Sequence, residues 1–453
     1  MNKIYSYILS ILHMSSEEDQ QRLWKVLLPT FMVQVAGMAI SFCVSLLMTR
    51  IMGAGSYGVY VYCFSVVMGL VNFIVYGPNI LALRETSSLL ALNKTGQWKG
   101  FMRWNINSLL VLSVAVSIIA SCIFYFFPVL PDNTYRIPIL IACTSIPLYS
   151  FLLLFSSVLR GLHKVLLSQL SEKLIRPVAL FLMLVVFYFS ARHITLYPAL
   201  IFNSISFLAC VLFVFWKYRI ESHPILKNIQ PEYERSRWMK EVSGLFLFGI
   251  FMSIESQIDV YMLAYLKPSS EVGIYNIANT AAGFTSFFLA ISNVVLAPSF
   301  AHLHTVQNRE KLQHLITQTI RWVMLMTAPL ALFTIIFSHW ILSLWGPEFV
   351  KGQWALIMLC SAHLINSAFG SVGNLALMSK FERYNGIVII ISIVINIVLN
   401  LLLTPQWGLN GTAFASALSI VVWNVTLFII VKNKTGISTW VFSSGNTKNT
   451  GNE

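Results

Sequence analysis

The hydrophobic residues of this chain fall in long runs separated by short polar segments. Each run is long enough for a helix to cross a hydrocarbon layer about 30 Å thick. Strands of a membrane barrel would alternate polar and apolar residues, and the continuous run from Val388 to Leu403 does not. Because lipid accepts only helices and closed barrels, the pattern predicts an all-α integral membrane protein. Its twelve predicted transmembrane helices are 26–50, 59–82, 104–127, 137–158, 169–191, 196–216, 244–266, 274–298, 319–343, 353–378, 385–403 and 409–431.

Composition excludes a soluble protein. The 453 residues are 57% hydrophobic and only 10% charged, with a mean hydropathy of +0.73, whereas about a quarter of the residues in a soluble domain are charged. Most of the 30 Lys and Arg residues fall at the two ends and in every second loop. Cytoplasmic loops carry this excess, so we expect both termini in the cytoplasm. The net charge of +13 then reflects topology, and we expect no nucleic-acid partner.

The segment before the first span carries one hydrophobic stripe, and the polar sequence SSEEDQQ follows it without the cleavage site of a secretory signal. We expect an interfacial amphipathic leader, with a disordered leader as the alternative. The stripe consists of Ile4, Tyr7, Ile8, Ile11 and Leu12. The cysteines lie inside predicted spans and form no Cys-x-x-Cys pair, so we expect no disulfide, metal or cofactor. They are Cys43, Cys63, Cys122, Cys143, Cys210 and Cys360.

Two short patterns recur along the chain. Gly58-Val59-Tyr60 follows the first span and Gly273-Ile274-Tyr275 follows the seventh, while LRGLHK (159–164) and LMSKFE (377–382) follow the fourth and tenth. The nearly constant shift predicts two parallel six-helix repeats. We expect an N-terminal lobe with the leader at 1–220 and a C-terminal lobe with a short cytoplasmic tail at 221–453. The alternative is that membrane-surface turns favour Gly and Tyr independently.

Three stretches are similar to one known family. LLMTRIMGAGSYGVYVY, ESQIDVYMLAYLKPSSEVGIYNIA, and LRGLHK leading into LSEKLIRPV resemble Wzx-type O-antigen flippases. These form part of the polysaccharide-transport branch of the multidrug/oligosaccharidyl-lipid/polysaccharide exporter superfamily. The resemblance covers the whole chain in length, span number and repeat plan.

This resemblance implies a V-shaped two-lobe exporter fold in the bacterial inner membrane. It implies a flippase for undecaprenyl-diphosphate-linked oligosaccharide, an O-antigen or related repeat unit used in lipopolysaccharide biosynthesis. The glycan would move from the cytoplasmic to the periplasmic leaflet. The resemblance also implies a coupling ion, proton or sodium, and surrounding membrane lipids as partners. A polysaccharide polymerase and a chain-length regulator are candidate protein partners.

Polar residues recur on one face of three predicted spans. Amides and hydroxyls suit sugars, which present many donors and acceptors, so these stripes predict a substrate lumen. The alternative is that they hold neighbouring helices together. The predicted lumen residues are Gln34, Ser41 and Ser45 in the first span, Asn72 and Tyr76 in the second, and Asn276 and Asn279 in the eighth.

Two acids in the seventh span, Glu255 and Asp259, are one helical turn apart, about 6 Å along the axis. Their repulsion predicts that at least one proton is retained near neutral pH. We therefore predict that they couple transport to an ion, with Asp259 the principal residue. An ion pair to a basic residue of a neighbouring helix is the structural alternative.

Three basic residues could meet the pyrophosphate. Arg176 lies deepest in a span, next to Pro177, and could pair with Glu172 four residues earlier. Its alternative is to extend to the cytoplasmic interface. Lys25 and Arg84 lie at the inner ends of the first two spans, where topology alone also accounts for them.

Other functional classes fit less well. A drug exporter of the same superfamily is the main alternative. A major-facilitator carrier is disfavoured because the loop LALRETSSLLALNKTGQWKG lacks an Asp-Arg-rich turn. A membrane enzyme of polysaccharide assembly, such as a polymerase, needs catalytic groups on sizeable loops. The predicted outer loops are short and hold no such constellation, so we expect neither an enzyme nor catalytic residues.

Overall fold

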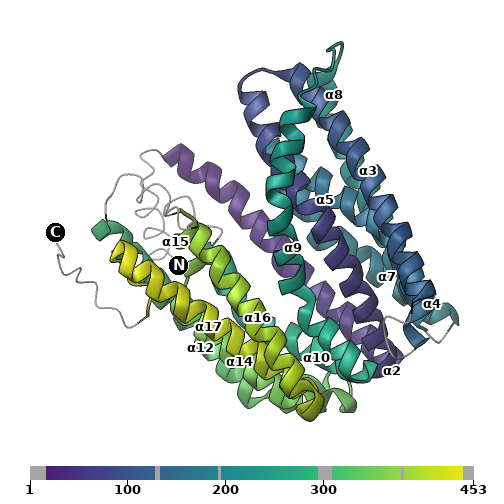
Figure 1. The fold of residues 1–453 in the computed structure, drawn as a ribbon, viewed down its shortest axis with the longest axis vertical. Coiled ribbons are helices and arrows are strands. Elements are labelled where there is room, and N and C mark those ends of the chain that lie inside the picture. Colours follow the sequence, from purple (N-terminus) through teal and green to yellow (C-terminus); the bar gives the residue numbers. More distant parts are fainter. Residues whose placement is uncertain (1–16, 128–132, 192–194, 294–308, 379–381, 442–453) are drawn as a thin grey trace. The chain divides into compact units, whose positions relative to one another are not determined.

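The computed structural model describes residues 17–127, 133–191, 195–293, 309–378 and 382–441, and throughout these ranges the regular elements are helices (Figure 1). The first group of helices is α2 (Glu17–Ala91), α3 (Thr95–Phe126), α4 (Arg136–Cys143), α5 (Ser145–Gly161), α6 (Val165–Gln169), α7 (Arg176–Ala191), α8 (Leu196–Leu226) and α9 (Arg235–Leu266). The second group is α10 (Ser269–Gly283), α12 (Arg309–Ile336), α13 (Ser338–Ser343), α14 (Gln353–Phe369), α15 (Val372–Met378), α16 (Glu382–Trp407) and α17 (Leu409–Thr435).

Within the described ranges the predicted spans are largely helical, but three of them are interrupted: the fourth at Thr144, the ninth at Phe337, and the tenth at Gly370 and Ser371. Within the described ranges, nine helical segments are long and apolar enough to cross a membrane, or ten if α9, bent by 41°, is counted as one span. The all-α integral membrane fold is thus confirmed. Contacts divide the chain into two compact units, here called the first unit (described residues of Gln21–Tyr265) and the second unit (described residues 17–20 and those from Leu266 onwards). This division follows contacts and does not test the predicted repeat boundary near residue 220.

The predicted loop between the first two spans is almost absent. Both spans lie in the single helical stretch α2, which is interrupted at Gly53, where φ is 71° and ψ is 172°. Glycine adopts a positive φ without a side-chain clash, so one residue changes the direction of the chain where a longer turn was expected.

The recurring Gly-Tyr steps lie inside helices rather than in turns. Gly58 comes five residues after the break at Gly53, and Gly273 comes five residues after Pro268, which caps α10. Tyr60 is 8% exposed and Tyr275 only 1% exposed. They are therefore packed residues and not anchors at the membrane surface. The shared spacing supports the repeat hypothesis, which remains a prediction.

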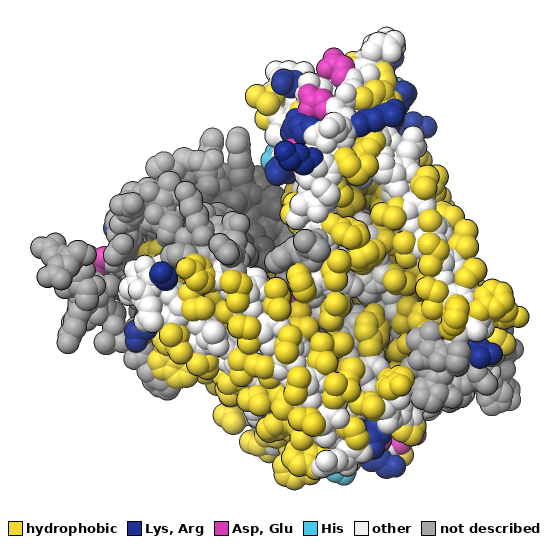
Figure 2. All heavy atoms as spheres, viewed as in Figure 1, with side chains coloured by type: hydrophobic (Ala, Val, Ile, Leu, Met, Phe, Trp, Pro, Cys, Tyr) yellow, Lys and Arg dark blue, Asp and Glu magenta, His cyan; other side chains and the backbone are white. Residues whose placement is uncertain are grey.

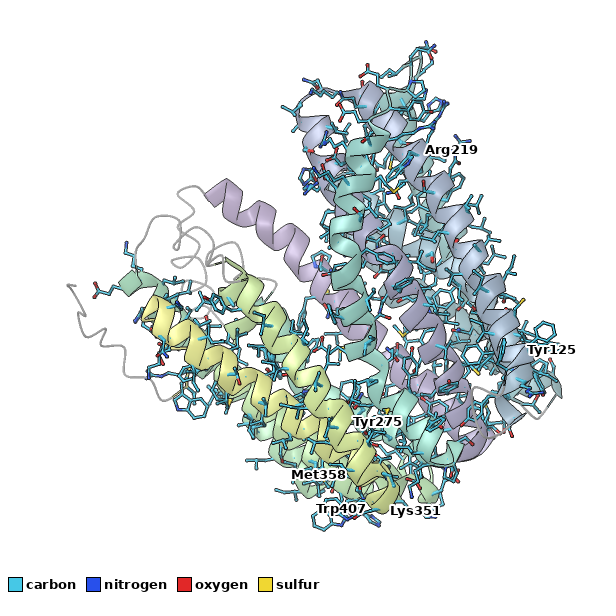
Figure 3. All side chains as sticks on the ribbon, viewed as in Figure 1. Tyr125, Arg219, Tyr275, Lys351, Met358 and Trp407 are labelled. Atoms are coloured by element: carbon cyan, nitrogen blue, oxygen red, sulfur yellow. The ribbon has the colours of Figure 1, made fainter. Side chains whose placement is uncertain are left out.

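One end of the first unit is rich in Lys and Arg, whereas its sides are hydrophobic (Figure 2). Here called the basic end, it gathers the end of α2, the start of α3, the ends of α5 and α8, and the start of α9. Lys99 Nζ donates to the Leu226 and Ile229 carbonyls at 3.1 and 2.8 Å, and Lys164 pairs with Glu221 at 3.1 Å. Figure 3 labels Arg219 towards this end of the unit and Tyr125 at the opposite end. The predicted charge asymmetry along the spans is thus present in this unit.

The second unit has its own core. Its buried cluster includes residues from α12, α15, α16 and α17, among them Ile320, Val372, Val388 and Leu427. The backbone N–H of Leu409 donates to Glu271 Oε2 at 2.7 Å. This carboxylate therefore caps the N-terminus of α17 from α10.

Candidate functional site

The side chain of Arg176 points into the helical bundle of the first unit. Its guanidinium donates to Asn203 Oδ1 at 3.2 Å and lies over the rings of Phe207 and Phe64, 4.3 and 4.9 Å from their centroids. Arg176 lies twelve residues beyond Lys164, roughly 18 Å at helical rise, which is near the middle of a 30 Å hydrocarbon layer. These contacts lie inside the first unit, and a contact between Arg176 and the substrate stays a prediction.

The backbone next to Arg176 is unusual, because residues Leu170–Ile175 form a π-helical turn between α6 and α7. π turns inside α-helices occur frequently at functional sites. Among the described residues no ion pair joins Glu172 to Arg176, although their spacing would allow one in a regular helix. A π turn needs an extra residue per turn, so side chains four residues apart are no longer aligned.

Several polar atoms near Arg176 have no hydrogen-bond partner. Within the described part of the chain, Arg176 Nε, Glu172 Oε1 and Gln169 Oε1 are buried and unbonded. Leaving such groups unsatisfied costs about 1–3 kcal/mol each, and in native proteins they call for an explanation such as a bound ion, water or functional role. Arg176, its acceptor Asn203 and Glu172 of the adjoining π turn are here called the Arg176 cluster.

Sequence reasoning missed part of this cluster. Asn203 is a single amide inside an apolar run, a signal that the sequence offered. The aromatic partners Phe64 and Phe207 carried no signal, because they are two among 32 phenylalanines.

The predicted lumen residues differ in exposure. Gln34, Asn72 and Tyr76 are half-buried, and Ser41 is exposed. Ser45 donates its hydroxyl to the Phe42 carbonyl of its own helix at 2.8 Å. In the second unit, Asn276 is half-buried and Asn279 exposed. Their shared lining of one lumen remains a prediction.

The two acids lie on α9 within the first unit. Glu255 is exposed and Asp259 half-buried. On another face of the same helix, Ser253 and Tyr261 donate to the α2 carbonyls of Gly69 and Ser65, at 2.5 and 2.9 Å. These bonds fix α9 against the second half of α2. The described residues contain no group of three or more His, Cys, Asp or Glu residues that could hold a metal ion.

Arg84 is engaged by carboxylates. It forms an ion pair with Glu241 and lies 4.0 Å from Glu85, which is 1% exposed and pairs with Arg237 at 2.7 Å. These four residues, here called the α2–α9 ion-pair cluster, join the end of α2 to the start of α9. A phosphate at Arg84 would have to compete with Glu241. Lys25 lies in α2, and its side chain is outside the described part of the structure.

Comparison with known proteins identifies the family. A family model described as "Polysaccharide biosynthesis protein" matches residues 23–304, and the MatE model matches residues 245–402. The "probable low-salt glycan biosynthesis flippase Agl15" of Haloferax volcanii is 24% identical over 202 residues. That match covers 44% of this chain and 41% of the relative, so it spans less than half of either protein.

Solved structures share the fold. An inward-facing multidrug resistance MATE family transporter of the MOP superfamily is 12% identical and superposes with a TM-score of 0.76, covering 88% of this chain and 94% of that one. The lipid II flippase MurJ, in an inward closed conformation, is 14% identical with a TM-score of 0.69, covering 89% of this chain and 87% of that one. At such identities the likeness shows the fold alone, and it confirms the predicted exporter fold. Because the first family model covers well over half of its length, the chain belongs to the polysaccharide biosynthesis protein family and has the membrane fold of the MOP-superfamily transporters.

Proposed function

We propose that this protein is a flippase for a polyprenyl-diphosphate-linked oligosaccharide. It would carry an O-antigen or related repeat unit from the cytoplasmic to the periplasmic leaflet of a bacterial inner membrane. The observation that carries the proposal is the guanidinium of Arg176, held near the middle of a span in a polysaccharide biosynthesis family member. A cation inside the bilayer is costly and marks a functional pathway.

The chemistry of this substrate fits the residues available. A guanidinium forms strong paired hydrogen bonds with phosphate oxygens, and Arg176 Nε has no protein partner. We therefore assign Arg176 the principal contact with the diphosphate, while Arg84 and Lys25 would meet it at the cytoplasmic leaflet. The glycan would follow a lumen lined by amides and hydroxyls, and the polyprenyl chain would stay in hydrocarbon. The lumen residues are Gln34, Ser41, Ser45, Asn72, Tyr76, Asn276 and Asn279.

Orientation in the membrane follows from the basic end of the first unit. Because cytoplasmic loops are enriched in Lys and Arg, we assign this end to the cytoplasm and expect both termini on the same side. The transporter relatives favour a carrier over an enzyme. A polysaccharide polymerase and a chain-length regulator are the partners expected to use the exported unit.

Complementation tests the function directly. The full chain is expressed in cells that lack their own O-unit flippase, and surface polysaccharide is measured. We expect export to be restored by the wild-type chain and lost with an empty vector. A correctly inserted chain that restores no surface polysaccharide with any of several donor O-units would contradict the proposal.

A multidrug exporter is the second candidate, favoured by the MatE match over residues 245–402. The same strains distinguish the two functions. Resistance to cationic dyes and drugs without restored polysaccharide would favour drug export, whereas restored polysaccharide without added resistance would favour the flippase.

A further inference from the structure

An apolar groove of about 590 Å³ lies within the first unit, between α2, α3 and α9. Its volume falls within the range of small-molecule sites. Val66, Leu70 and Phe73 of α2, Ile119 and Ile123 of α3, and Ile254 of α9 are among the residues that line it. None of these side chains can form a hydrogen bond, so the groove suits a hydrocarbon ligand.

Four hydroxyl side chains line the groove, Tyr62, Ser253, Tyr261 and Tyr265, and two of them are engaged in hydrogen bonds to α2. Ser253 and Tyr261 line it, and their hydroxyls donate to the Gly69 and Ser65 carbonyls. Gly69 permits this approach, because a Cβ there would collide with the Tyr261 hydroxyl. The hydrogen bonds join α9 to α2 along one wall, and the lining left for an occupant is mostly apolar.

The groove opens towards the lipid-facing side of α3. Ile119 is 56% exposed and Ile123 is 44% exposed, and both lie in a helix with a long apolar span. Along α9 the lining runs from Ile250 to Tyr265, roughly 22 Å at helical rise. A long narrow groove of this kind accommodates a single extended chain.

The distance between the groove and the basic end sets a minimum chain length for a lipid whose head lies at that end. Phe73, the lining residue of α2 nearest that end, is eleven residues from Arg84, roughly 16 Å at helical rise. One leaflet of hydrocarbon is about 15 Å deep, half of the total thickness. An anionic lipid whose head lies at the basic end therefore needs a chain longer than one leaflet to reach the groove.

Charge places the head at this end. In the segments 84–103, 160–164 and 217–241, Lys and Arg outnumber Asp and Glu, and Arg84 and Arg237 line the α2–α9 seam. A diphosphate head with a long polyprenyl chain meets both requirements, whereas a phospholipid head at the basic end brings acyl chains that end before the groove. We infer that the groove binds the distal part of the substrate's polyprenyl chain while the diphosphate is at the basic end. This inference rests on the proposed function.

Photocrosslinking in proteoliposomes of the full chain tests this site. One probe is a long-chain polyprenyl diphosphate with a diazirine on its last isoprene unit, and the other is phosphatidylethanolamine with a diazirine at the end of an acyl chain. We expect polyprenyl adducts on the groove segments of α2, α3 and α9, suppressed by unlabelled polyprenyl diphosphate but not by excess phospholipid. Polyprenyl adducts spread over other lipid-facing helices, or groove adducts suppressed equally by phospholipid, would overturn the inference.

Substitutions at the groove supply the matched comparison. Ile119→Trp at the mouth and Leu70→Trp inside should reduce polyprenyl adducts by about tenfold, a change equivalent to roughly 1.4 kcal/mol. Val111→Trp is the control, because Val111 lies on α3, is 70% exposed and does not line the groove. Equal adduct yields in Ile119→Trp, Leu70→Trp and Val111→Trp would also overturn the inference.

If wild-type cells export polysaccharide but the groove is not labelled, only this inference fails. If export and all polyprenyl labelling are absent, both this inference and the proposed function fail.

Discussion

Arg176 carries a charge that is costly to place inside a membrane but well suited to bind a phosphate group. Its guanidinium lies over two phenylalanine rings, and one donor, Nε, is buried without an acceptor. Cation–π contacts contribute about 0.5–2 kcal/mol, which partly offsets the cost of a charge inside the membrane. A phosphate oxygen would satisfy the free donor and neutralise the charge at the same time.

We expect Arg176→Ala to abolish export and Arg176→Lys to retain only part of it. Lysine keeps the charge but loses the planar group that stacks on aromatic rings and binds phosphate in pairs. The measurement is surface polysaccharide in the complemented strain at matched protein levels.

Lys173→Ala is the control, since Lys173 lies in the same π turn and is exposed. It should export like the wild type. Full export by Arg176→Ala would remove Arg176 from the diphosphate site.

At the scale of elements, hydropathy predicted the long apolar helices that lipid requires, but it did not predict the local breaks within them. Most of the predicted spans coincide with long apolar helices of the described residues, because a helix in hydrocarbon must be apolar over its full length. The break at Gly53 and the π turn at Leu170–Ile175 were missed. Both are local departures from helix geometry, and they depend on packing against neighbours. Gly37, for example, packs where a Cβ would collide with the Lys173 carbonyl of the π turn.

The α2–α9 ion-pair cluster is an element-scale contact with a measurable contribution to stability. Arg237→Ala would leave the buried Glu85 carboxylate without its 2.7 Å partner. We expect a loss of about 1–3 kcal/mol, the cost of an unsatisfied buried group. The readout is thermal unfolding of the detergent-purified protein.

Arg235→Ala provides the comparison, because Arg235 is an exposed neighbour that lies over the Tyr233 ring. It should change stability little. Adding Glu85→Gln to Arg237→Ala should recover part of the loss, since it removes a buried charge that keeps only the 4.0 Å contact with Arg84. Equal unfolding temperatures for Arg237→Ala and the wild type would contradict this role for the cluster.

At the scale of the whole molecule, fold and family could be predicted, but the lumen could not. A polar stripe on one helix can line a lumen, bind a neighbouring helix or form hydrogen bonds to its own backbone. Which of these it does depends on the helix that faces it. Ser45 and Thr49 illustrate this, because both hydroxyls donate to carbonyls of their own helix. The contacts of the Arg176 guanidinium likewise come from α2 and α8, which no single span reveals.

A carrier must also return to its starting conformation after each cycle. A coupling ion can drive this change of the whole molecule. A ligand shifts a two-state equilibrium only through its different affinities for the two states, and a carboxyl whose surroundings change between states provides such a difference. Asp259 is half-buried on α9, one turn further from the basic end than the exposed Glu255. Asp259 is therefore nearer than Glu255 to the side from which protons or sodium would enter. Because it is more buried than Glu255, its surroundings would change more when neighbouring helices move.

We therefore expect Asp259→Asn to abolish or strongly slow export while the protein remains folded and inserted, and Glu255→Gln to have a milder effect. Ser256→Ala is the matched control, because Ser256 is exposed and its hydroxyl bonds only within α9, to the Ser253 carbonyl. Export is measured at low expression, with and without an agent that collapses the ion gradient. If Asp259 carries the coupling ion, wild-type export should fall towards the Asp259→Asn level when the gradient is removed. Full export by both neutral variants, or an unchanged gradient dependence in Asp259→Asn, would show that the two acids are structural.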